Sequence, residues 1–227
     1  MTDYRACVDL IENRVKQYTA EELEAMNARI QQAGVTCLKP EEFQRSKHGQ
    51  RLGQEPPWRL ENLESISPPA PWPSISSPSS KPQILAGIKV LELCRVIAGP
   101  SMGRGLAEYG ASVLKVTSPN LSDVPFFQVD GNLGKHTCDL NLRQAEDRAT
   151  FEALLQETDV VLDGYRPGSL ERLGYGPQQI IDLTKSRGRG IVYIAEDCFG
   201  HVGEWAGRPG WQQIADCVTG IAWLQGY

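Results

Sequence analysis

The sequence lacks the features that place a protein in a membrane, outside the cell or on nucleic acid. No apolar run approaches the roughly 20 residues that span a bilayer, and the N-terminus has no hydrophobic core of a secretory signal. Basic residues are not in excess, because the net charge is −5. This balance argues against a nucleic-acid partner. We therefore expect a cytoplasmic protein with no nucleic acid and no membrane among its partners.

Patterns typical of metal sites and disulfide frameworks are also missing. The six cysteines form no C-x-x-C pair, and the three histidines are dispersed along the chain. We therefore expect reduced, mostly buried thiols and no metal site. His136 follows Lys135 and leaves two interpretations open, a residue near a ligand or an ordinary surface histidine, of which the second is favoured.

What is present is enough apolar material for one good-sized domain with an appendage, since 41% of the 227 residues are hydrophobic. The clearest pattern lies in residues 87–116. A β-prone run is followed by Ala98-Gly99-Pro100, which suits the start of a helix, and Gly110 suits its end. A second strand then begins at Val113. The pattern predicts a strand–helix–strand unit, in which ligands bind beyond the carboxyl ends of the strands and phosphate is attracted to the helix start.

The first predicted strand contains two charged residues, Lys89 and Glu92. We expect them to lie near an end of the sheet, because a parallel strand covered on both faces is mostly apolar. The same alternation of helices and strands continues along the chain. The predicted elements are a helix capped by Asn141 and running to about 156, a strand at 159–162, a helix from Pro177, a strand at 191–194 and a helix at 212–224.

The N-terminal part has a different character. Residues 3–17 predict an amphipathic helix with Cys7, Leu10, Ile11 and Val15 facing inward, and Thr19 to Glu22 is a capping box that begins a second. Pro40 begins a third, short helix. Residues 56–82 are rich in Pro and Ser and predict a linker, with a proline-motif docking site at 68–73 as the alternative.

Several short motifs follow the strand–helix–strand unit in a fixed order. They are Gly134-Lys-His136, Asp139-Leu-Asn-Leu142, Tyr165-Arg-Pro-Gly-Ser-Leu-Glu-Arg-Leu-Gly174, Phe199-Gly-His201 and Arg208-Pro-Gly-Trp211. The series resembles the family III CoA-transferases (CaiB/BaiF), the group that includes formyl-CoA transferase and α-methylacyl-CoA racemase. The resemblance covers roughly residues 85–224, and the run that begins at Tyr165 is its most specific piece.

The resemblance implies an α/β fold with a Rossmann-like, open and mostly parallel sheet with flanking helices, preceded by a small helical segment and the Pro/Ser-rich linker. It also implies that CoA is bound as a substrate rather than as a cofactor. The positions that match the family's CoA-binding residues are Val96, Ile97, Leu140, Gly164, Tyr165, Arg166, Ser169, Arg172 and, less securely, Arg208.

The chemistry of these residues agrees with that role. Arg166 and Arg172 offer planar cationic donors for phosphate, and Tyr165 suits the adenine. Formyl-type specificity is not expected, because Ile97 stands where formyl-CoA transferase has a polar side chain that assists catalysis.

The family's catalytic aspartate lies beyond the segment that matches residues 211–225, and the sequence stops at Tyr227. Asp216 falls inside a predicted helix and is a poor substitute, so we nominate no catalytic residue. A carboxylate nucleophile matters in this chemistry because it holds the acyl group covalently while CoA is exchanged.

The order of the segments predicts three parts. Residues 1–55 resemble the helical end of the family's small domain, 56–83 form the linker, and 84–227 form a CoA-binding domain incomplete at its C-terminus. We therefore expect a truncated or partial member, completed as a homodimer or by a partner chain.

Three functions remain open. The first is transfer of CoA between an acyl-CoA and a carboxylic acid, with this chain supplying the CoA-binding half. The others are a non-catalytic CoA-binding remnant, suggested by the missing aspartate, and a racemase-like isomerase, which needs an acid/base pair not visible in the sequence.

Overall fold

The computed structural model describes residues 3–63, 67–73 and 83–226. The chain divides into two compact units. One, which we call the helical unit, contains residues 1–59 and 198–227; the other, the sheet unit, contains residues 60–197. Each unit is described by itself.

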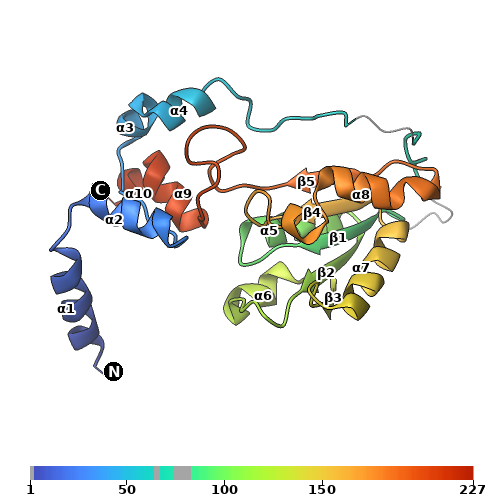
Figure 1. Ribbon diagram of the computed structural model, residues 1–227, viewed down its shortest axis with the longest axis horizontal. Coiled ribbons are helices and arrows are strands. Elements are labelled where there is room, and N and C mark those ends of the chain that lie inside the picture. The colour runs from blue at the N-terminus through green and yellow to red at the C-terminus, as the bar shows by residue number, and fades with distance from the viewer. Residues whose placement is uncertain (1–2, 64–66, 74–82, 227) are drawn as a thin grey trace. The chain divides into compact units, whose positions relative to one another are not determined.

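The sheet unit is built on five parallel strands in the order β3-β2-β1-β4-β5 (Figure 1). The strands are β1 (Lys89–Leu93), β2 (Ser112–Thr117), β3 (His136–Asp139), β4 (Val160–Asp163) and β5 (Val192–Ala195). The helices are α5 (Ala98–Glu108), α6 (Pro125–Gly131), α7 (Ala145–Glu157) and α8 (Pro177–Thr184), with 3-10 turns at Glu171–Leu173 and Lys185–Arg187. The expected α/β class with a parallel sheet and flanking helices is confirmed.

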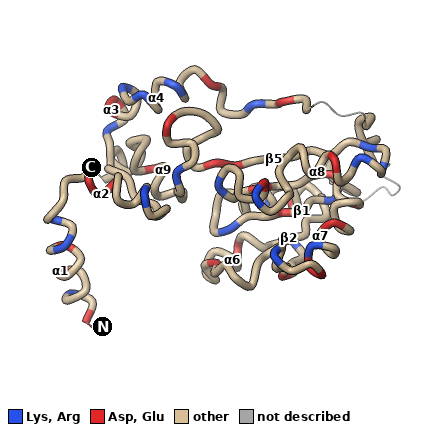
Figure 2. The backbone as a smooth tube through the Cα atoms, in the orientation of Figure 1, with Lys and Arg blue, Asp and Glu red and all other residues tan. Residues whose placement is uncertain are grey.

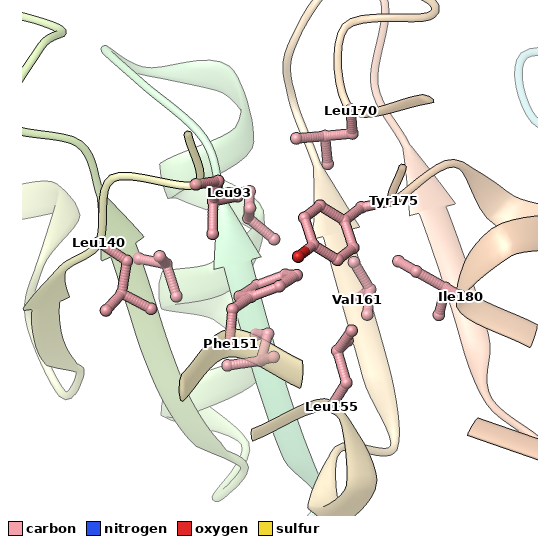
Figure 3. Close-up of a cluster of buried hydrophobic side chains, with 11 residues drawn as sticks. Leu93, Leu140, Phe151, Leu155, Val161, Leu170, Tyr175 and Ile180 are labelled. Carbon is pink, nitrogen blue, oxygen red and sulfur yellow. The ribbon is translucent and has the colours of Figure 1, made fainter. Parts of the chain in front are cut away.

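Alternation along the central strand divides the core between the two faces of the sheet. Val90 of β1 and Cys94, which follows the strand, pack on the side of α5 in a cluster with Val113 and Leu162. Leu91 and Leu93 point to the opposite side, which α7 and α8 cover. That second cluster is centred on Phe151 and Tyr175, whose rings meet edge to face at 4.8 Å, and Figure 3 shows the surrounding side chains converging on them.

The predicted strand–helix–strand unit is confirmed in its essentials. Helix α5 begins at Ala98, and Gly110, just past its end, has a φ of +101°. One detail is wrong: Glu92 does not lie at an exposed sheet end but is fully buried in the central strand. Burial is possible because the Nζ of Lys135 lies 2.5 Å from its Oε2.

Two further helix predictions need correction. Asn141 does not cap α7, which begins at Ala145; its side chain instead accepts the Arg143 N–H at 3.2 Å in a local turn. The helix expected over 212–224 is two helices, separated by Gly220 at a φ of +89°. A side chain at Gly220 would collide with Pro40, and the positive φ also favours glycine, so this break between the two helices requires a glycine.

The helical unit contains α1 (Tyr4–Val15), α2 (Ala20–Arg29), α3 (Pro40–Arg45), α4 (Lys47–Leu52), α9 (Gln212–Thr219) and α10 (Ile221–Gln225). The capping box between Thr19 and Glu22 is confirmed. The face of α1 that we expected to be buried is not: Leu10, Ile11 and Val15 are all exposed. Periodicity shows which face of a helix is apolar, but not whether anything covers it.

The unit division differs from the three parts expected from the sequence. Residues 198–227 cluster with the N-terminal helices, whereas we expected them to belong with 84–197. One contact that holds them there is the backbone hydrogen bond from Leu38 N–H to the Cys217 carbonyl, at 3.0 Å. The linker expected over 56–83 lies partly outside the described residues.

His48 is the buried centre of an aromatic cluster in the helical unit. Its ring stacks on Trp205 at 4.7 Å and meets Phe199 edge to face. Nε2 lies 3.0 Å from the Phe199 carbonyl, and Nδ1 accepts the Trp205 N–H at 3.3 Å. This pair of contacts fixes a neutral imidazole with its proton on Nε2. Burial accordingly lowers the pKa of His48 below 6.5.

We expect the helical unit to lose stability as the pH falls. The pKa of His48 is lower in the folded protein than its ordinary value of 6.5. The stability that the neutral imidazole contributes is therefore complete above pH 6.5, and it declines as the pH falls from there toward the folded pKa. NMR titration of the imidazole should give a value below 6.5. H48Q should flatten the pH dependence, because it removes the buried imidazole. A titration at or above 6.5 would contradict this account.

Candidate functional site

The sheet topology defines where a ligand fits best. From β1 the chain passes through α5 to β2 on one side, and from β3 it crosses through α7 to β4 on the other. The strand order therefore reverses between β1 and β4. In open parallel sheets this reversal leaves a crevice beyond the carboxyl ends of the two strands, where ligands bind. The segments after β1 and β4 form the candidate site.

Small residues bring these two segments close together. The buried Cys94 follows β1, and its Sγ lies where side chains at Gly99 and Gly164 would have to go. The N–H of Gly164 donates to the Leu93 carbonyl at 3.1 Å, which joins the end of β4 to the end of β1. Burial raises the pKa of the Cys94 thiol, so it acts as a packing residue and not as a thiolate.

Tyr165 is the first large side chain after β4. Its N–H donates to Asp163 Oδ1 at 2.9 Å, and Tyr193 donates its hydroxyl to the other oxygen of the same carboxylate at 2.6 Å. The ring is half-buried against the core cluster of Figure 3, and burial raises the pKa of Tyr165 to about 12. The phenol is therefore neutral near pH 7 and offers an O–H and a ring face.

The remainder of the loop after β4 presents two exposed arginines, Arg166 and Arg172. Turns shape it: the N–H of Ser169 donates to the Arg166 carbonyl, and that of Arg172 donates to the Gly168 carbonyl. Arg172 also donates from a guanidinium nitrogen to Ser169 Oγ at 3.2 Å. Gly168 has a φ of +75°, a conformation that glycine adopts without strain. The buried Leu170 anchors the loop to the core.

The structure thus brings most of the positions expected from the sequence to one edge of the sheet. Val96 and Ile97 follow β1, and Gly164 to Arg172 follow β4. Leu140 follows β3 at the same edge, but its side chain is buried in the core. Arg208 belongs to the helical unit, where it pairs with Glu24 at 3.4 Å and stacks over Trp205.

A cavity of about 430 Å³ opens beside the turn after β1. Its walls come from Val96 and Ile97, from the first turn of α5 and from Phe126, Phe127 and Val129 of α6. The lining is largely apolar, and the volume is in the range of small-molecule pockets. Neither α6 nor this cavity was predicted from the sequence, because residues 118–131 carry little periodicity.

Sequence reasoning also missed a group of buried charges behind the turn. It contains Glu92 with Lys135, and Lys115 with Asp123 at 3.3 Å. Burial raises the pKa of Glu92 and lowers that of Lys135, although each partner's charge opposes the shift. The charged residues in strands β1 and β2 were the available signal, since a parallel strand buried on both faces keeps a charge only when it is paired.

Arg143 was also not predicted from the sequence as a site residue. It follows β3 at the carboxyl edge and is exposed. Across the described chain, basic and acidic residues are interspersed and not segregated (Figure 2). At the carboxyl edge itself, Arg143 after β3 and Arg166 and Arg172 after β4 are exposed and positively charged, in a protein whose net charge is −5.

The described residues show no sign of two other kinds of site. No three His, Cys, Asp or Glu side chains there are grouped so that they could hold a metal ion. No helix among them combines the length and apolar character that a membrane span requires.

Fold and site together define an open parallel α/β protein in which the segments after β1 and β4 meet at the strand reversal. The family model described as "CoA-transferase family III" matches residues 85–227, and the chain belongs to that family. It is 40% identical over 222 residues to "Acetyl-coenzyme A transferase nodX" of Hypoxylon pulicicidum, covering 96% of this chain and 37% of that protein. It is 39% identical over 227 residues to "Acyl-CoA transferase" of Gibberella moniliformis, covering 97% and 39%.

A solved structure gives the same result. The chain is similar to a CaiB/BaiF family protein from Brucella suis, with a TM-score of 0.52 and 29% sequence identity over 60% of this chain and 39% of that one. The chain therefore spans less than half of the length of these relatives.

Proposed function

We propose that this chain supplies the CoA-binding part of an enzyme that transfers CoA between an acyl-CoA and a carboxylic acid. The observation that carries the proposal is the meeting, at the strand reversal, of the segments after β1 and β4, which hold most of the positions where the family resemblance implies CoA contacts. Membership of the family and relatives named as CoA or acyl-CoA transferases support it. The acyl donor and the acceptor acid are not assigned.

The roles follow from the chemistry of the edge. Arg166 and Arg172, in the loop after β4, would pair with phosphate oxygens of CoA. Arg143, which follows β3 at the same carboxyl edge, is a further candidate for this role. The neutral Tyr165 would offer its ring and hydroxyl to the adenosine. Backbone groups of Val96, Ile97 and Gly164 would meet the rest of the ligand, since glycine and the tight turn allow close approach. Coenzyme A would be a substrate, and no catalytic side chain is assigned.

Removal of the Arg172 guanidinium tests this assignment. We expect R172A to bind CoA about ten- to a hundredfold more weakly in calorimetry, because a hydrogen bond to a charged group contributes about 1.5–3 kcal/mol. R172K should recover only part of the affinity, since an ammonium lacks the planar fork. The control is K89A, which removes one positive charge at the amino end of β1, the opposite edge of the sheet. No CoA binding by the parent chain would count against the proposed function.

Catalysis needs a separate experiment. The purified chain should be assayed for CoA transfer alone and with a candidate partner chain. Transfer only in the presence of the partner would support the proposed division of labour. CoA binding with no transfer in any combination would favour the non-catalytic alternative.

A further inference from the structure

Val96, at the turn between β1 and α5, has an unfavourable backbone conformation. Its φ is +67°, in the left-handed region, and Gln31 is the other non-glycine residue with a positive φ in the part of the chain that the structure describes. Branching at Cβ makes this region costly for valine. Such a conformation persists only where the surroundings hold it, and it is often found at ligand sites.

The group that holds Val96 is the carboxylate of Asp123, in the segment between β2 and α6. Asp123 Oδ1 accepts the Val96 N–H at 3.1 Å and the Val124 N–H at 2.8 Å. A second tether lies beside it, because the guanidinium of Arg95 donates to the Ser122 carbonyl. Ser122 and Asp123, just before α6, therefore hold the turn after β1 through two hydrogen bonds.

The carboxylate is itself fixed by a buried cation. Lys115 of β2 lies 3.3 Å from Asp123 Oδ2, and the side chains of the two residues are 1% and 9% exposed. Burial opposes ionisation of Asp123, but the N–H groups of Val124 and Val96 and the Lys115 ammonium outweigh it, so its pKa is lowered. Asp123 is therefore charged at neutral pH and accepts the Val96 N–H strongly.

Lys115 is placed by the strand next to it. It lies opposite Glu92 in the β1–β2 register, and Glu92 is paired with Lys135. The Lys135 ammonium also donates to the Pro100 carbonyl at 2.7 Å, in the first turn of α5. The charged group thus fastens the turn after β1 at its start, through Val96, and at the helix that follows, through Pro100.

We propose that Asp123 is a positioning residue for CoA: it holds Val96 in the left-handed conformation so that the turn after β1 is preformed for the ligand. The inference rests on the proposed function. Without Asp123, Val96 would relax to a common conformation, and only a fraction of molecules would have a competent turn. The apparent dissociation constant rises in inverse proportion to that fraction.

A double-mutant cycle with glycine tests the inference, because glycine adopts a positive φ at little cost. We expect D123A to weaken CoA binding about tenfold in calorimetry. In a V96G background the same substitution should weaken CoA binding only about twofold. In a V96A background it should weaken CoA binding nearly as much as in the parent, because alanine keeps a Cβ and is therefore strained at a positive φ. If D123A does not fold, K115M/D123A carries the same comparison, since it removes the buried ammonium together with its partner.

The outcomes separate the two proposals. Equal CoA binding by the folded D123A variant and the parent would overturn the role of Asp123 and leave the proposed function intact. An equal loss in the V96G and V96A backgrounds would also overturn it, because a merely structural defect would not depend on the residue at 96. A parent chain that binds no CoA would overturn the proposed function and this inference with it.

Discussion

Replacing Lys135 by methionine is expected to destabilise the sheet unit by about 3–5 kcal/mol. The substitution leaves the Glu92 carboxylate in the central strand without its cation, and an unpaired buried charge is among the costliest defects in a protein. Both side chains of the pair are completely buried, and Nζ and Oε2 are 2.5 Å apart. Amide hydrogen exchange in β1 and β4 measures the loss, because central strands exchange by global unfolding of their unit.

The chain offers a matched control for this prediction. Lys89 and Glu157 form another lysine–glutamate pair in the same unit, at 2.6 Å, but their side chains are 54% and 72% exposed. K89M should therefore cost no more than about 1 kcal/mol. E92M/K135M should recover most of the loss, because two apolar side chains replace the pair without leaving a charge behind.

The pH dependence of the K135M variant provides a further check. Burial already raises the pKa of Glu92, and without Lys135 it should lie higher still. A carboxyl whose folded pKa is raised stabilises the fold below its unfolded pKa and loses that contribution as the pH rises through the folded pKa. The deficit of K135M should thus be smaller at acidic than at alkaline pH. A pH-independent deficit, or equal losses in K135M and K89M, would contradict this account of the pair.

The elements that the sequence predicted well are those in which local chemistry and burial agree. The strand–helix–strand unit of residues 87–116 is an example. There a proline suits the first turn of a helix, a glycine accepts the left-handed conformation that ends it, and the apolar runs on either side are buried. The loop from Tyr165 to Gly174 was found because its residues form a continuous motif. Its position beside the turn after β1 follows from the strand order, which short-range patterns do not encode.

The features that the sequence did not predict depend on contacts between distant residues. From the sequence alone, Glu92 indicates an end of the sheet. It is buried instead because Lys135, far along the chain, pairs with it. His48 is buried through contacts with Phe199 and Trp205, which lie about 150 residues away in the sequence. Asp123 acts on Val96 from a segment with little periodicity. In each case the individual residue looks ordinary, and its role comes from the partner.

Replacing Phe151 by alanine is expected to destabilise the sheet unit by about 3–5 kcal/mol. Phe151 of α7 is fully buried, and truncation loses its transfer free energy and leaves a cavity. The ring also contacts Tyr175 edge to face, in the cluster that contains Leu170 (Figure 3). Because Leu170 anchors the loop with Arg166 and Arg172, the same substitution should weaken CoA binding through loosening of that loop. Hydrogen exchange in the central strands and calorimetry with CoA measure the two effects.

Two further variants separate the effect of F151A on the stability of the sheet unit from its effect on CoA binding. F126A removes the same side chain at an 81% exposed position of α6 and should change stability by no more than about 0.5 kcal/mol. L170A shortens the anchor itself, so it should weaken CoA binding more, relative to its cost in stability, than F151A does. If F151A lost 3–5 kcal/mol but kept the parent's CoA affinity, the loop would hold its shape through its own turns. The hydrogen bonds from Ser169 N–H and Arg172 N–H would then be enough to keep the arginines in place. The core would position β4 but not the loop that follows it.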